Sequence, residues 1–140
     1  MRTTSIAALL FACTAVVPVA ASAHGGPTGA VYTMTNAADN NEIVRFERDK
    51  DGALVETGRY STEGRGNGGG LGSQGAIALA QGGHLLLAVN VGSNDVSVFK
   101  VAGDELRLVE RAASGGTAPI SVATRGDRVY VLEAGGAGDV

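Results

Sequence analysis

From Ala30 onward, apolar residues recur at every second position in short stretches, which is the spacing of half-buried β-strands. Clusters of glycine, asparagine and aspartate separate these stretches and are typical of tight turns. No stretch beyond residue 23 has the 3.6-residue periodicity of an amphipathic helix. The pattern therefore predicts an all-β chain, with strands over residues 31–35, 43–46, 54–60, 75–80, 84–91, 96–99, 106–109, 120–123 and 129–132.

The predicted strands repeat as a unit. An apolar strand, a turn and a second strand follow one another in residues 31–46, 85–99 and 128–140, and this comparison aligns Val31 with Leu85. A unit of four short strands that recurs at intervals of ~40–50 residues is typical of β-propeller blades. The sequence therefore predicts antiparallel four-stranded blades, about two and a half of them, from a truncated propeller.

The repeat also predicts where each part of the chain begins and ends. A flexible mature N-terminus at 24–29 precedes the partial propeller at 30–140. Natural propellers close with 4–8 blades, so we expect the sequence to be a piece of a longer protein or to pair with another chain. An isolated piece would expose a strand edge and tend to aggregate. The predicted parts are blade one at 30–62, a flexible glycine-rich insertion at 63–73, blade two at 74–113 and the start of blade three at 117–140.

Residues 1–23 have the pattern of a secretory signal peptide. Arg2 supplies a short positive start, residues 6–20 are an apolar run, and residues 21–23 are the small side chains that a signal peptidase recognises. The apolar run is short for a membrane span of ~20 residues. We therefore expect cleavage before His24 and a periplasmic or secreted protein.

Charge and cysteine content narrow the class of partner. The chain has 11 Lys+Arg against 14 Asp+Glu, and this negative balance disfavours nucleic acid and an anionic membrane surface. The single cysteine, Cys13, loosely resembles part of a lipoprotein box, but the apolar run continues past it to Ala20. We therefore interpret Cys13 as a residue of the signal, which leaves the mature chain without a disulfide.

Two segments carry a resemblance to a known family. Residues 83–90 (GHLLLAVN) and 92–99 (GSNDVSVF) together are similar to the blade core of the lactonase-like seven-bladed β-propellers, and residues 115–123 (GGTAPISVA) resemble the segment that begins a blade there. That family includes bacterial 6-phosphogluconolactonases and fungal carboxymuconate cyclases. The resemblance implies an N-terminal fragment of such a propeller and an exported protein that hydrolyses or isomerises a sugar or muconate lactone.

The alternative is a non-enzymatic periplasmic propeller that serves as a binding platform for a small molecule or a protein at its channel face. Many blades of the family carry a histidine after the first proline, facing the channel, whereas this chain has Ile120-Ser121 and Gln74-Gly75 at those places. No catalytic residue can therefore be assigned from the resemblance, and catalytic groups are expected from other blades. Whether the chain is an enzyme stays open at this point.

Few side chains offer candidate chemistry. Arg65, in the glycine-rich run 64–72, is a candidate for binding an anionic group of a ligand, such as the phosphate or carboxylate of a lactone. The run itself lacks the G-x-x-x-x-G-K-[ST] spacing of a nucleotide-binding loop. His84, at a turn before an apolar strand, is a second candidate ligand contact. His24 and the acidic turns do not have the spacing of a metal site, so neither a metal nor a cofactor is predicted.

Overall fold

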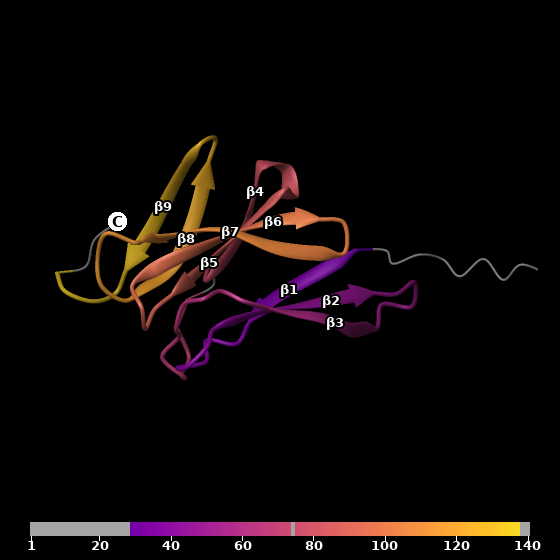
Figure 1. Ribbon diagram of the computed structural model, residues 1–140, viewed down its shortest axis with the longest axis horizontal. Helices are drawn as coiled ribbons and strands as arrows, with labels where there is room; N and C mark the ends of the chain where they lie inside the picture. The colour runs from indigo at the N-terminus through magenta and orange to yellow at the C-terminus, as the bar shows by residue number, and fades with distance from the viewer. Residues whose placement is uncertain (1–28, 74, 138–140) are drawn as a thin grey trace, which may run out of the picture.

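The chain folds into three antiparallel sheets that follow one another in sequence (Figure 1). The computed structural model describes residues 29–73 and 75–137; the predicted signal peptide and most of the predicted N-terminal segment lie outside the described residues. Sheet one contains β1 (Ala30–Met34), β2 (Glu42–Arg48) and β3 (Leu54–Ser61). Sheet two contains β4 (Ile77–Ala80), β5 (Leu85–Asn90), β6 (Asp95–Ala102) and β7 (Glu105–Ala113), and sheet three contains β8 (Pro119–Arg125) and β9 (Arg128–Glu133).

The prediction of an all-β fold with antiparallel sheets is confirmed. Within each sheet every strand pairs with its neighbour in the chain through a short connection, as period-two patterning with turn clusters predicts. Among the described residues, the one helical element is the single 3₁₀ turn η1 (Gln81–Gly83) between β4 and β5. Sheet two has the predicted four strands, while the described parts of sheets one and three have three and two.

The strand register corrects the alignment of the repeat by one residue. Val31 lies opposite Phe46, and Leu86 lies opposite Phe99. Val31 therefore corresponds to Leu86, and the prediction that it corresponds to Leu85 is wrong. The physical reason is that cross-strand partners fix the face on which a side chain lies, whereas the β1–β2 connection absorbs extra residues without changing that face.

Alternate side chains along a strand face opposite sides of its sheet, and those that face a neighbouring sheet form the core between the two. Sheets one and two are joined by a cluster of Ile43, Leu86 and Phe99, each at most 1% exposed, with Ala88 and Leu106. A buried aliphatic or aromatic side chain of this size contributes ~1.5–3 kcal/mol relative to an exposed one. Sheets two and three are joined by a second cluster, which comprises Ala80, Leu87, Val89, Val96 and Val122. Because β5 and β6 contribute alternate residues to both clusters, sheet two is packed on both faces.

Candidate functional site

Connections between the strands gather at one end of the three sheets, which we call the loop end. It contains the segments at 35–41 (β1–β2), 62–73 and 75–76 (β3–β4), 91–94 (β5–β6) and 114–118 (β7–β8). Hydrogen bonds join these segments across the sheets, as in Asn41 N to Gly64 O at 3.0 Å. The β2–β3 and β6–β7 turns lie together at the other end, on the right of Figure 1.

The loop end holds a buried polar network where sheets one and two meet, which we call the first junction. At its centre is Asn90, which is fully buried. The Asn90 Oδ1 atom accepts hydrogen bonds from Asn41 Nδ2 (2.9 Å) and Thr62 Oγ1 (2.8 Å). The Asn90 Nδ2 atom donates to Asp95 Oδ1 (2.6 Å) and Ser97 Oγ (2.8 Å). One amide therefore joins both sheets, and a fully satisfied buried network of this kind makes the junction rigid.

The glycine-rich segment is built into this junction. A Cβ on Gly64 would overlap the Asn90 side chain, and one on Gly66 would overlap the backbone of Asn36. The Asn36 side chain in turn donates to Asn67 Oδ1 (2.6 Å) and Gly69 O (2.7 Å). The prediction of a flexible insertion is therefore wrong for residues 64–69, because glycine here permits close approach of neighbouring segments rather than freedom of motion.

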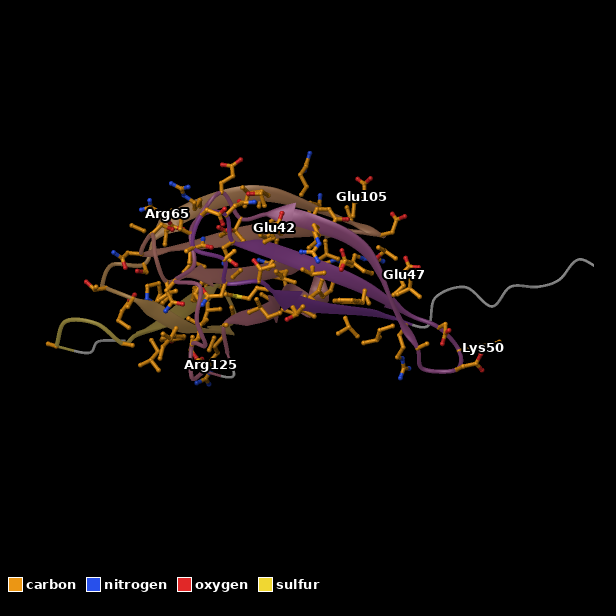
Figure 2. All side chains as sticks on the ribbon, turned by 90° about the horizontal axis from the view of Figure 1, so that it is seen from below. Glu42, Glu47, Lys50, Arg65, Glu105 and Arg125 are labelled. Carbon is orange, nitrogen blue, oxygen red and sulfur yellow. The ribbon has the colours of Figure 1, made fainter. Side chains whose placement is uncertain are left out.

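Arg65 lies within the fixed part of this segment. Its backbone N–H donates to Ser93 Oγ at 2.9 Å, and its carbonyl accepts from Gly92 N at 2.8 Å. The side chain itself is exposed and lies at the loop end, far from Lys50 in the β2–β3 turn (Figure 2). The structure thus presents a guanidinium group to solvent from a backbone that is held on both sides.

His84, the second predicted site residue, lies at the other end of sheet two. It is exposed and directly precedes β5, while Ser93, the partner of Arg65, follows β5. The six residues of β5 span ~20 Å at ~3.3 Å per residue. The structure therefore does not bring Arg65 and His84 together, and one small ligand cannot contact both.

Sheets two and three meet in an equivalent arrangement, the second junction. Ser114 N donates to Asn94 O (3.0 Å), as Thr62 N donates to Asn41 O (2.9 Å) in the first junction. Glu133 takes the place of Asn90, with Gly116 packed against its side chain. Glu133 is 5% exposed, and both carboxylate oxygens are buried without a hydrogen-bond partner among the described residues.

The positions that correspond to the family's channel-facing histidine lie side by side. Val122 N donates to Gly75 O at 2.7 Å, and the hydroxyl of Ser121 forms a short hydrogen bond with that of Ser73. Gln74 lies outside the described residues. A shallow hollow of about 250 Å³ opens beside these positions, lined by Gly75, Ser121, Val122, Ala123, Tyr130 and Leu132.

One buried charge escaped the sequence analysis. Arg45 of β2 is 5% exposed, and its Nη1 atom donates to Glu47 Oε1 (2.9 Å) and Thr57 Oγ1 (2.6 Å). Burial lowers the pKa of Arg45, but Glu47 and the Tyr32 hydroxyl more than offset it, so the pKa lies above its usual value. The alternation of β2 placed an arginine in line with apolar residues. Its contact with Thr57 across the β2–β3 pair, beside Glu47 two residues along β2, shows how Nη1 is satisfied, while Nε is buried without a hydrogen-bond partner among the described residues.

Residues 29–73 and 75–137 are the part of the chain that the structure describes. That part of the chain contains no group of three or more His, Cys, Asp or Glu side chains able to hold a metal ion. It also contains no helix of the length and apolar character that a membrane span requires.

The sheets define a class of protein. Consecutive antiparallel sheets that pack face to face, each made from one stretch of chain, are the blades of a β-propeller, and the described residues form part of one. Residues 30–135 match the family "Lactonase, 7-bladed beta-propeller", and the chain belongs to that family. No curated protein and no solved structure matched the chain in the corresponding comparisons.

Proposed function

We propose that this protein is an exported lactonase-type propeller that acts on a small lactone, of a sugar or of muconate, and that Arg65 binds the anionic group of this ligand. The single observation that carries the proposal is the match to the lactonase propeller family over residues 30–135. Hydrolysis of a lactone requires a base to activate water and donors to stabilise the negative charge that develops on the carbonyl oxygen. The family therefore supports a cyclic ester as the ligand, and the anionic group is the part of the proposal that rests on Arg65.

The geometry of the loop end supports the role of Arg65. A guanidinium group binds a phosphate or carboxylate best when it is pre-positioned, because less side-chain and backbone freedom is lost on binding. The backbone of Arg65 is held by Ser93 and Gly92, and its side chain is free to meet a ligand from solvent. His84 has no part in this proposal, since it lies at the other end of sheet two.

A second candidate function is a non-enzymatic binding platform. The observation that favours it is the hollow beside Gly75 and Ser121, which Tyr130 and Leu132 line with apolar surface. Tyr130 and Leu132 are both 43% exposed. Apolar rings and aliphatic groups in a concavity suit the binding of an uncharged ligand or a protein side chain.

An Arg65→Ala substitution tests the first proposal. We expect it to weaken binding of 6-phosphogluconate, an anionic sugar acid, by about tenfold, because a charge-assisted hydrogen bond is lost. The measurement is titration calorimetry on the full chain, with hydrolysis of the corresponding lactone followed in parallel. The control is Arg125→Ala, which removes another exposed arginine; it lies at the end of β8, the opposite end of that strand from the 114–118 connection. Unchanged binding and turnover in the Arg65 variant would eliminate the role of Arg65.

The same assays separate the two candidate functions. Lactone turnover above the spontaneous rate supports the enzyme. Saturable ligand binding without lactone turnover supports the platform. In that case Tyr130→Ala should abolish the binding and Arg65→Ala should leave it intact.

Export is tested on the expressed protein. Secretion with cleavage of the signal would give a mature protein that begins at His24, as the pattern in residues 1–23 predicts. Mass spectrometry of the protein from the periplasm or medium measures this end directly. A protein recovered only in the cytoplasm with Met1 or Arg2 at its start would contradict export.

A further inference from the structure

We infer that Arg111 of β7 is a positioning residue for the loop end, because it fixes the glycine-rich segment that presents Arg65. The inference rests on the proposed anion-binding role of Arg65 and adds a residue from a different strand, 46 positions further along the chain. It predicts that the affinity of Arg65 for an anion depends on Arg111, although Arg111 need not touch the anion.

The contacts of Arg111 join three parts of the molecule. Its Nη1 atom donates to the backbone carbonyl of Glu63, at the start of the glycine-rich segment. Its Nε atom lies 3.6 Å from Asp95 Oδ2. The other oxygen of Asp95 accepts from Asn90 Nδ2, so Arg111 is anchored to the buried network of the first junction. The segment before Arg65 is therefore tied to sheet two by a side chain as well as by backbone bonds.

The residue that Arg111 holds has an unusual backbone conformation. Glu63 has a φ of +56°, in the left-handed region that side chains with a Cβ disfavour. Its N–H is held by Ser61 Oγ at 3.0 Å, and its carbonyl by Arg111. This conformation turns the chain from Thr62, inside the junction, toward Arg65 at the surface. The N–H at the other end of the Glu63–Gly64 peptide, on Gly64, donates to Thr62 Oγ1 at 3.1 Å. Loss of the Arg111 bond would leave the peptide held at that one end and would spread the Arg65 side chain over a wider range of positions.

Blade one contains a matched arginine that lacks this role. Arg59 lies opposite Val44 in sheet one as Arg111 lies opposite Ser97 in sheet two. Arg59 Nη1 lies 3.6 Å from Glu42 Oε2, the same separation as in the Arg111–Asp95 pair. Arg59 also bonds Glu56 through Nε at 2.8 Å, and among the described contacts it does not reach the glycine-rich segment. Arg59 is therefore a control for the removal of a paired arginine from an outer strand.

The test is a double-mutant cycle on the full chain, with inorganic phosphate and 6-phosphogluconate as probes in titration calorimetry. We expect Arg111→Met to weaken binding about three- to tenfold, and Arg111→Lys, which keeps a donor within reach of the Glu63 carbonyl, to restore most of the loss. We expect Arg59→Met to leave binding unchanged. In the Arg65→Ala background, Arg111→Met should cause no further loss, because there is no longer an arginine to position.

Three outcomes would overturn the inference. Equal losses from Arg111→Met with and without Arg65 would show that Arg111 binds the anion directly. Unchanged affinity in Arg111→Met, with the loss in Arg65→Ala intact, would remove the positioning role and leave the proposed function standing. Unchanged affinity in Arg65→Ala would remove the proposed role of Arg65, and the inference with it. Thermal melting shows whether each variant is folded. If Arg111→Met is not folded, Arg111→Gln, which removes the guanidinium group but keeps a polar side chain on the strand, provides the same test.

Discussion

The two junctions at the loop end share a backbone and differ in how their buried polar groups are satisfied. Gly92 N bonds Arg65 O at 2.8 Å in the first junction, and Gly135 N bonds Thr117 O at 2.9 Å in the second. In the first junction, Asn90 finds four hydrogen-bond partners. In the second, the carboxylate of Glu133 has none among the described residues. The counterparts of Asn41 and Thr62, which are Asn94 and Ser114, bond each other and not Glu133. A repeated backbone therefore does not by itself repeat this part of the network.

This difference bears on function because the two junctions present different residues at the same place. The equivalent of Arg65 in the second junction is Thr117, as the matched backbone bonds of Gly92 and Gly135 show. The rigid junction thus carries the exposed cation, and the less satisfied one carries a neutral side chain. The first junction is therefore the one that has a satisfied buried network and also presents a charged side chain, Arg65, as a candidate ligand contact.

The largest effect is expected from Gly92→Ala. The added Cβ would overlap the carbonyl group of Gly66, so the glycine-rich segment must move away from its partners. We expect a loss of ~3 kcal/mol in the free energy of unfolding, the upper range for overpacking of a closely packed site. Urea unfolding measures it. The comparison variant is Gly135→Ala, whose Cβ would lie 2.8 Å from Thr117 Cγ2 and 2.9 Å from Thr117 O, a milder overlap than the one between a Cβ on Gly92 and Gly66 O. A loss in Gly135→Ala as large as that in Gly92→Ala would contradict the comparison.

A somewhat smaller effect is expected from Asn90→Ala. The substitution removes the oxygen that Asn41 Nδ2 and Thr62 Oγ1 share as an acceptor, and the donor to Asp95 Oδ1, in a buried site. Asn41 Nδ2 keeps Val89 O (3.2 Å) and Thr62 Oγ1 keeps Asn41 O (2.9 Å). Unsatisfied buried groups cost ~1–3 kcal/mol each, and partial relaxation brings the expected net loss to ~2–3 kcal/mol. The same unfolding experiment measures this value. A loss below ~1 kcal/mol would show that the network contributes little to the rigidity of the first junction.

The smallest effect, of opposite sign, is expected from Glu133→Gln. This change removes a buried charge without a partner and keeps the shape of the side chain. Because an unpaired buried charge is costly, we expect the free energy of unfolding to rise by ~1 kcal/mol at neutral pH. Thermal and urea unfolding both report it. A marked destabilisation would mean that Glu133 has a partner beyond the described residues, and that the second junction holds its buried polar group as the first one does.

The sequence predicted the strands and their grouping because both follow from local physics. Strand residues alternate between two faces, and turn residues such as those at 49–52 and 103–104 stop one strand and start the next. The repeat of these units indicated a propeller, and the family match agrees with it. The strand register was harder to predict from the sequence. The alignment of Val31 was wrong by one residue because the β1–β2 connection is longer than the β5–β6 connection, its counterpart in sheet two.

The candidate site was predictable only in part. A lone arginine in a glycine-rich run drew attention to Arg65, but its chemistry depends on Ser93, Gly92 and Arg111, which lie 27 or more positions further along the chain. No local pattern reveals that Arg111 reaches Glu63, since exposed strands commonly alternate charged residues. The sequence also could not show how far apart its two candidate ligand contacts, Arg65 and His84, lie in the fold. The length of β5 separates them.

The amino-acid sequence by itself determined that this chain forms short antiparallel strands in repeated units, because side-chain alternation and turn chemistry act over a few residues. Tertiary structure alone decided that the glycine-rich segment is fixed, that Asn90 is satisfied while Glu133 has no partner within residues 29–73 and 75–137, and that Arg65 and His84 are apart. These properties depend on which groups meet across neighbouring sheets, and a contact between distant residues leaves no periodic signal in either of them.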